Sequence, residues 1–372
     1  MDVSKVPPLQ AVARLAGLLD SPEIAALVSE LEATRWTGRP GYPIRAMVGM
    51  ALVKSLYAIP TWSRTAALVS EHPALQATLG CSPSVYACYR FATKLRAHSD
   101  KLDACIGNIL SGLRVSHPEL GRDVSIDASD LPAYANGQRF LSKGGPERER
   151  YSDPDASWGH PSAVSTRKGG GYYGYKIHAA VDSMTGLPLA WTIETARDAE
   201  QTHAPDLLDA LHSRGFRPET CAMDSGYDVG PVYDAFEARD CHPIVKLRQT
   251  TAVKRGDHKP PTCEHGPWRF GGTDYKRKAT KWRCPTGECR PASRWVKTDR
   301  LHPLIPRETL RWGKLYADRS AVERAFGRAK HEWGLLPLRV RGIDRVELHA
   351  DLTVLAQLGC ALARVRAVPL AA

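Results

Sequence analysis

The chain has 372 residues, enough for two or three domains that each bury a substantial core. Its 51 Lys and Arg residues outnumber its 40 Asp and Glu residues, and the formal charge of +11 favours a polyanionic partner such as nucleic acid. Residues 1–10 contain no apolar signal-peptide core, and the longest apolar run, residues 46–53, is too short to cross a bilayer. The composition therefore argues against a membrane protein and predicts a soluble, cytoplasmic one.

Residues 1–118 predict a helical domain in which amphipathic segments alternate with short turns. Ser82 and Pro83 are typical of an N-cap and a first helical position, so we expect a helix to begin there. Arg90 and Lys94 would share one face of it and make it a candidate DNA-contacting helix of a helix-turn-helix module. A plain helical bundle has the same spacing, so both interpretations stay open.

Residues 122–131 alternate apolar and polar side chains with the period of a β-strand. Asp127 lies on the polar face of this strand. Because inter-strand hydrogen bonds hold the backbone of a central strand rigidly, a carboxylate at this position is suited to placing a metal ion.

The next elements predict the rest of an α/β domain. Residues 134–170 are rich in Gly, Ser, Pro and charge and predict a loop. A hairpin over residues 171–196 precedes a helix, a short strand that ends at Asp224, a second helix and a further strand. Over residues 119–250 this order is that of an RNase H-like domain, a mixed α+β fold in which helices flank a mixed sheet.

Residues 251–314 interrupt this order with a basic segment in which aromatic residues alternate with Lys and Arg. Such a segment can neutralise phosphates and stack on bases, although a solvated β-rich insertion has the same composition. A Cys-x-His pair and a Cys-x4-Cys pair could bind one structural zinc ion, with the loose ligand set Cys263, His265, Cys284 and Cys289. The other six of the nine cysteines are scattered, as expected of buried thiols in a reducing compartment.

Residues 315–372 are expected to complete the core with two helices, the second of them apolar and packed on the sheet. Residues 316–333 predict a single helix, because Ala, Glu, Arg and Lys dominate and neither Gly nor Pro interrupts before Gly327. At about 100° per residue, a sector of roughly 60° holds Tyr316, Arg319, Glu323 and Lys330. A solvated helix would normally spread its charges around its polar face. The clustering in this sector alone does not decide between an ordinary solvated face and a functional site.

The spacing Tyr-x2-Arg-x3-Glu-x6-Lys in this helix resembles the Y-R-E-K motif of bacterial insertion-sequence transposases of the DDE superfamily. The pattern GRPGYP…LVKSLY…SPSVY…F is also similar to the helical domain that precedes the catalytic domain in many of these proteins, where it serves in DNA-end binding or dimerisation. The resemblance implies three catalytic carboxylates, Asp127, Asp224 and Glu323. Asp228 is the strongest competitor for the second place, but it lies beyond Gly226 and off the strand.

For the chemistry, the resemblance implies two Mg²⁺ or Mn²⁺ ions, bridged by Asp127, with Asp224 and Glu323 completing one coordination shell each. Such ions neutralise the phosphodiester, activate the attacking oxygen and stabilise the leaving 3′-oxygen. The remaining motif residues are expected to contact DNA, with Tyr316 and Arg319 at the scissile phosphate and Lys330 on the adjacent strand.

The expected function is cleavage of the ends of an insertion sequence and transfer of the freed 3′-hydroxyl into target DNA. The expected partners are double-stranded DNA, as terminal inverted repeats and target, and a second copy of the chain, at the nucleoid. Two alternatives stay open. One is an RNase H-like nuclease that cuts without joining, and the other is a transposase-derived DNA-binding regulator without catalysis, against which the presence of all three acids argues.

Overall fold

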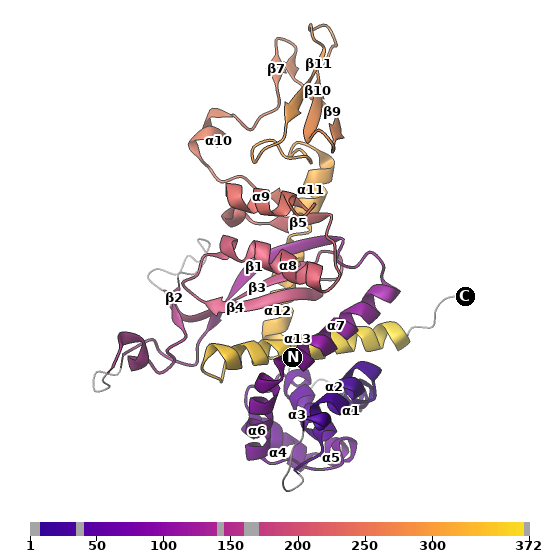
Figure 1. Ribbon diagram of the computed structural model, residues 1–372, viewed down its shortest axis with the longest axis vertical. Coiled ribbons are helices and arrows are strands. Elements are labelled where there is room, and N and C mark those ends of the chain that lie inside the picture. Colours follow the sequence, from indigo (N-terminus) through magenta and orange to yellow (C-terminus); the bar gives the residue numbers. More distant parts are fainter. Residues whose placement is uncertain (1–7, 35–40, 140–144, 160–170, 368–372) are drawn as a thin grey trace.

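The computed structural model of the chain describes residues 8–34, 41–139, 145–159 and 171–367 (Figure 1). Helices lie at the bottom of the view, a mixed sheet in the middle and a small β-rich unit at the top. The helices of the first part are α1 (Pro8–Leu19), α2 (Pro22–Ala33), α3 (Ile44–Leu56), α4 (Trp62–Glu71), α5 (Pro73–Leu79), α6 (Val85–Ala97) and α7 (Ser99–Ser116).

Helix α6 begins two residues later than predicted. Ser84, in an extended conformation, is its N-cap, and the Ser84 hydroxyl accepts a hydrogen bond of 3.3 Å from the backbone N–H of Ala87. The prediction that Ser82 caps this helix is therefore wrong. Serines stand on both sides of Pro83, and the sequence does not show which hydroxyl accepts the hydrogen bond from the first helical turn.

The central sheet has the mixed topology expected of an RNase H-like domain, and the predicted fold class is confirmed. Its strands run in the order β2-β3-β1-β5-β6, and β4 also pairs with β3. β1 pairs antiparallel with β3 and parallel with β5, which pairs parallel with β6. The strands are β1 (Asp123–Pro132), β2 (Ser157–Gly159), β3 (Tyr172–Asp182), β4 (Pro188–Thr195), β5 (Thr220–Met223) and β6 (His242–Val245).

Both faces of this sheet are covered by helices. Helix α8 (Ala204–Ser213) packs on β3 and β4 on one face, and α12 (Ser320–His331) packs on β1 and β3 on the other. Alternate residues of β1 accordingly enter different cores: Val124 and Ile126 pack with α8, while Leu131 packs with α12. Asp127 has the same parity as Leu131, so its side chain lies on the face that α12 covers.

Strand β2 lies inside the segment predicted to be a loop, so that prediction is wrong for residues 157–159. Three residues are too few for a period-two pattern, and β2 is held by its pairing with residues 172–174 of β3. Residues 140–144 and 160–170 of the same segment lie outside the described residues.

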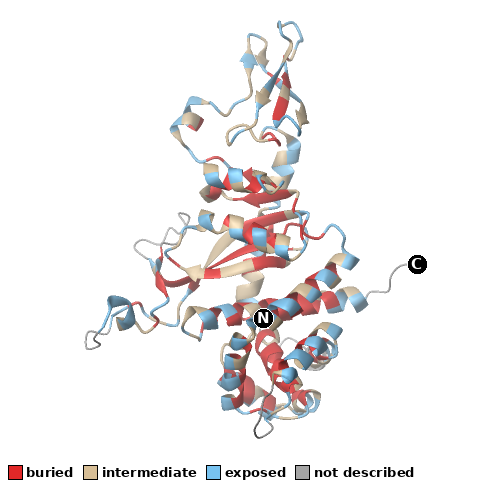
Figure 2. Ribbon diagram, in the orientation of Figure 1, coloured by how far each residue is buried: buried red, intermediate tan, exposed pale blue. Residues whose placement is uncertain are grey.

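The basic segment between β6 and the last helices forms a β-rich insertion. Its elements are α10 (Thr251–Arg255), β7 (Thr262–Cys263), β8 (Gly266–Pro267), β9 (Arg269–Asp274), β10 (Ala279–Arg283) and β11 (Ser293–Lys297). The last three form an antiparallel sheet around a small core centred on Trp268 and Trp282. Figure 2 shows that most of the insertion is exposed or half-buried, in contrast to the sheet below it.

The predicted helix over residues 316–333 is two helices, α11 (Leu310–Ala317) and α12, so the prediction of a single helix is wrong. At their junction the hydrogen bonds tighten to the i−3 spacing, from Arg319 N to Tyr316 O and from Ala321 N to Asp318 O. The carbonyl of Asp318 also accepts from the Ser125 hydroxyl of β1 at 3.2 Å. This break depends on a residue about 190 positions away, and no local signal marks it.

The last helix, α13 (Ile343–Ala367), joins the helical part of the chain to the sheet. It packs on β4, as predicted, and also on α3 and α7. By length and hydropathy α13 could cross a membrane, but 78% of its apolar window is buried inside the protein, as in the core helix of a soluble protein. A single core cluster contains side chains from the helices, the sheet and α13.

Because this core is shared, we expect Leu355→Ala to destabilise the helical part and the sheet together. Leu355 is 1% exposed, and a truncation of this kind in a core costs about 2–5 kcal/mol. Urea unfolding followed by circular dichroism and tryptophan fluorescence measures the loss. The matched control is Leu310→Ala, at a side chain that is 87% exposed, and an equal loss in both variants would contradict the assignment of α13 as the joining core helix.

The buried imidazole of His178 predicts a loss of stability in acid. His178 is 0% exposed, neither ring nitrogen has a hydrogen-bond partner among the described residues, and its ring lies 4.5 Å from that of His203. Burial, together with the charges of His203 and Lys176, lowers the pKa of His178 to about 3. The unfolded chain takes up this proton near pH 6.5 and the folded chain does not, so stability falls as the pH drops from about 6.5 towards 3, by up to about 1.4 kcal/mol per pH unit.

His178→Phe keeps a ring against His203 and removes the titrating group, so the free energy of unfolding should depend less on pH between 6.5 and 4. Exposed His117→Phe is the matched control. An unchanged pH dependence in His178→Phe would show that other groups cause the acid sensitivity.

Candidate active site

Two aspartates meet because β1 and β5 run parallel in a fixed register. Ser125 of β1 pairs with Ala222 of β5, and Asp127 and Asp224 each lie two residues farther along the chain. Residues two apart on a strand point to the same face, so both side chains project from adjacent strands towards α12. Asp224 directly follows the last residue of β5, as the sequence predicts.

Both carboxylates are half-buried, and each accepts a hydrogen bond from a nearby backbone N–H. The Oδ1 atom of Asp127 accepts from the N–H of Ala128 at 2.8 Å, and that of Asp224 accepts from the N–H of Gly226 at 2.6 Å. Burial, together with the neighbouring charge of Asp224, raises the pKa of Asp127 to about 7. Burial also raises the pKa of Asp224. Two acids that disfavour each other's charge are suited to binding a cation between them.

Glu323, in the first turn of α12, reaches the pair through Arg319. The Arg319 Nη1 atom lies 3.3 Å from Asp127 Oδ2, and its Nη2 atom lies 2.6 Å from Glu323 Oε1. The side chain of Glu323 is 56% exposed, but its carboxylate is turned towards Asp127 by this shared guanidinium. The first and third acids therefore converge on one cationic group.

The other motif residues surround the same point. Lys330 donates from Nζ to Ser129 Oγ and to the carbonyl of Asp130, both at 2.7 Å, on the strand that carries Asp127. Tyr316 stacks on Trp312 with 4.9 Å between ring centroids. Burial raises the pKa of Tyr316, and the nearby charges of Arg319 and Asp224 act on it in opposite directions. Arg90 and Lys94 lie elsewhere, on α6, where Arg90 is exposed and Lys94 donates to the carbonyl of Leu31.

Asp228 is buried in a hydrogen-bonded cluster, so it does not compete with Asp224 for the second place among the predicted catalytic acids. Its side chain is 0% exposed and accepts from Arg300 at 2.6 Å, from the backbone N–H of Arg248 at 2.8 Å and from the hydroxyl of Tyr233 at 3.0 Å. These bonds tie the loop after β5 to the insertion. An acid that already accepts three hydrogen bonds is a structural group.

Sequence reasoning missed Glu200, which lies in a short turn before α8. Its charge raises the pKa of both Asp127 and Asp224, and Lys176 Nζ lies 2.9 Å from its Oε1 atom. No motif marks Glu200, because its approach to the pair comes from contacts between its turn and the turn after Asp224. A further group whose ligand atoms lie within 4.8 Å of one another is Glu194, Asp198 and His203.

The donor set of the predicted site fits a hard divalent cation. It consists of carboxylate oxygens only, and two of the three acids are half-buried and lie on adjacent strands. Within the described ranges, the three acids do not form one of the groups whose ligand atoms all lie within 4.8 Å. Arg319 lies between Asp127 and Glu323 and neutralises part of their charge.

The insertion contains a separate Cys/His centre at the predicted residues. The ligand atoms of Cys263, His265, Cys284 and Cys289 all lie within 4.8 Å of one another. The Sγ atoms of Cys263 and Cys284 are 3.8 Å apart, and His265 Nδ1 lies 3.6–3.9 Å from the three sulfurs. These separations match the edges, about 3.6–3.8 Å, of a tetrahedron with Zn–S near 2.3 Å and Zn–N near 2.0–2.1 Å. His265 Nε2 also lies 2.9 Å from a carboxylate oxygen of Glu288, a partner that would orient the imidazole as a ligand.

Two family models match the chain. Residues 119–358 match the family described as "Transposase DDE domain", and residues 3–91 match the family described as "Transposase domain (DUF772)". None of the curated proteins matches the chain. Among solved structures, the chain is similar to the piggyBac transposase in a cryo-EM synaptic complex with hairpin DNA, at 11% identity and a TM-score of 0.41, over 95% of this chain and 74% of that chain.

A similarity as distant as that to the piggyBac structure carries no information on chemistry. The two family matches confirm the resemblance to insertion-sequence DDE transposases, while the Y-R-E-K branch stays a prediction. The match to the DDE domain alone spans more than half of this chain. The chain therefore belongs to the DDE-domain transposases.

Proposed function

We propose that this transposase cuts the ends of an insertion sequence and transfers the freed 3′-hydroxyl into target DNA, with Asp127, Asp224 and Glu323 as the metal-binding carboxylates. The observation that carries the proposal is the register of β1 and β5, which sets two half-buried acids on one face of the sheet next to Arg319 and Glu323. Mg²⁺ or Mn²⁺, when bound there, would activate the attacking oxygen and stabilise the leaving one.

The protein's own residues would hold the DNA strand for this reaction. The guanidinium of Arg319 keeps Asp127 and Glu323 turned towards each other and has further N–H donors for the phosphate at the scissile bond. The phenol of Tyr316 lies close enough to Arg319 to share that phosphate. Lys330, seven residues after Glu323, would contact the adjacent strand near Ser129. Water and a 3′-hydroxyl would use the same position, so cutting and joining need one site.

The partners we propose are the terminal inverted repeats and the target duplex, together with a second copy of the chain, because an element has two ends to pair. Arg90 and Lys94 on α6 stay candidates for end recognition.

Substitution of any of the three acids should abolish cleavage of a duplex that carries the element's own ends. We expect Asp127→Asn, Asp224→Asn and Glu323→Gln to lose at least about 100-fold in rate, because even outer-shell changes at metal sites cost about 10–100-fold. Glu332→Gln, at the exposed end of the same helix, is the matched control for Glu323→Gln. Cleavage at the normal rate by Glu323→Gln would remove Glu323 from the site.

Pre-cleaved ends separate the transposase from a nuclease of the same fold. The proposed function predicts that the wild-type chain joins such ends to a supercoiled plasmid, and that Glu323→Gln does not. A chain that cleaves intact ends but never joins pre-cleaved ones would be a nuclease, and one that binds ends without either reaction would be a regulator.

We also propose that the Cys/His centre binds one zinc ion and stabilises the insertion. Elemental analysis of the purified chain should find about one zinc per chain, and Cys284→Ser with Cys289→Ser should abolish it and make the insertion sensitive to limited proteolysis. Cys81→Ser, outside the centre, is the matched control. Retention of zinc in the double variant, or absence of zinc from the wild type, would contradict the proposal.

A further inference from the structure

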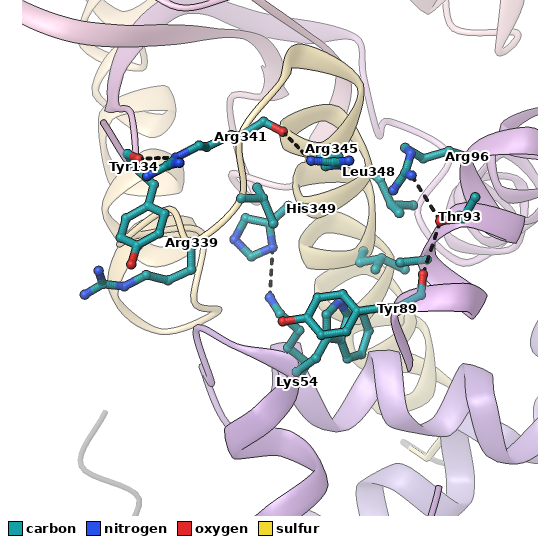
Figure 3. Close-up of a pocket in the computed structure, with 14 residues that line it drawn as sticks. Lys54, Tyr89, Thr93, Arg96, Tyr134, Arg339, Arg341, Arg345, Leu348 and His349 are labelled. Carbon is teal, nitrogen blue, oxygen red and sulfur yellow. Dashed lines mark hydrogen bonds between the residues drawn. The ribbon is translucent and has the colours of Figure 1, made fainter. Parts of the chain in front are cut away.

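A cavity of about 460 Å³ opens between α6, α13 and the segment that joins α12 to α13 (Figure 3). Tyr134, just beyond the end of β1, forms part of its wall, and Lys54 of α3 forms its floor. The cavity thus lies where the helical part of the chain meets the catalytic part. The site described above does not include it.

The lining of this cavity is strongly basic, with Lys54, Arg96, Arg339, Arg341 and Arg345 and no carboxylate. Arg96 donates to Thr93 Oγ1 at 3.2 Å, and Arg341 donates to the carbonyl of Tyr134 at 2.8 Å. Among the described residues, none of the four arginines makes an ion pair within 4.0 Å. Burial lowers the pKa of Arg96, and the charge of Arg345 lowers it further, against the weaker opposite effect of Asp344.

Cations that are held together without a direct ion pair repel one another, so this arrangement costs free energy. The floor adds to this cost. Lys54 is 5% exposed, and its Nζ atom lies 3.1 Å from Nδ1 of His349 and 5.8 Å from the centre of the Trp62 ring. A buried ammonium opposite an imidazole has no counter-charge, and an anion in the cavity would supply it.

Aromatic rings interleave with these cations. Tyr134 is 45% exposed and lies within 5.0 Å of the Arg339 guanidinium and 5.1 Å of that of Arg341. Tyr89 of α6, 52% exposed, lines the opposite wall. An arginine that stacks on an aromatic ring holds its planar guanidinium in a fixed orientation, in which its N–H groups can donate to a phosphate. Exposed tyrosines can stack on the sugars and bases of the nucleic acid.

The cavity is connected to the active site along β1. Tyr134 follows Asp127 by seven residues, a span of about 23 Å at 3.3 Å per residue, or about seven nucleotides of a duplex strand. Lys330 contacts Ser129 and Asp130 between these two points. Basic groups are therefore available from the catalytic acids to the cavity.

We propose that this cavity is a phosphodiester-binding groove that holds the duplex DNA leaving the active site and guides it onto the helical domain. The proposal rests on the proposed function and adds to it the surface that carries the DNA. It places this contact of the departing duplex on the side of α6 that carries Arg96, while Arg90 stays a candidate for end recognition.

The test is fluorescence anisotropy of a labelled 30-base-pair duplex with the full-length chain in metal-free buffer, over a salt series. Arg96→Gln with Arg345→Gln removes two phosphate contacts, so the slope of log K against log salt should become shallower by about 1.8. The dissociation constant at 0.1 M salt should rise at least about tenfold. Arg96→Lys with Arg345→Lys should keep most of the slope, and equal thermal melting would show that all variants are folded.

Arg64→Gln with Arg364→Gln is the matched control, since both arginines are exposed and neither lines the cavity. Equal loss of affinity in this control would indicate a net-charge effect and overturn the proposal. So would a loss confined to Arg90→Gln, or competition by polyglutamate as strong as that by unlabelled DNA. Because binding is measured without metal, failure of the catalytic assignment would appear in the cleavage assay and leave this result independent.

Discussion

The parallel pairing of β1 with β5 is the constraint on which the rest of the structure depends. It aligns Ser125 with Ala222 and so sets Asp127 and Asp224 on one face of the sheet. Helices cover both faces of the sheet: α8 packs on β3 and β4 on one face, and α12 packs on β1 and β3 on the other, while α11 contacts β5. A shift of one residue in the register would turn one acid away from α12 and separate the pair.

Burial of these acids is unfavourable in the empty protein, and the surrounding structure compensates only in part. Arg319 pairs with Asp127 and Glu323, while Glu200 adds negative charge near both aspartates. Sites that concentrate like charges in this way trade stability for the ability to bind an ion. The cavity between α6 and α13 concentrates charge of the opposite sign, because its lining contains five basic side chains and no carboxylate. The acidic site at Asp127 and the basic cavity at Tyr134 therefore lie within seven residues of each other, on and just beyond β1.

Local sequence patterns were sufficient for the elements that carry strong periodicity. The alternation around Asp127, the strand before Asp224 and the helix around Glu323 are all present, because each is decided by neighbours within a few residues. The features that the sequence did not predict depend on contacts between residues far apart in the chain. The break between α11 and α12 follows from a hydrogen bond to Ser125, and the approach of Glu200 follows from packing between two turns. The basic groove assembles residues from α3, α6, α13 and the end of β1, which no linear pattern links.

The most direct test of the central claim is anomalous X-ray diffraction from crystals of the chain loaded with Mn²⁺. The account predicts peaks within coordination distance of Asp127, Asp224 and Glu323, with Arg319 displaced from between the first and third acids. Manganese bound at Glu194, Asp198 and His203 alone, with Asp127 and Asp224 free of metal, would contradict it.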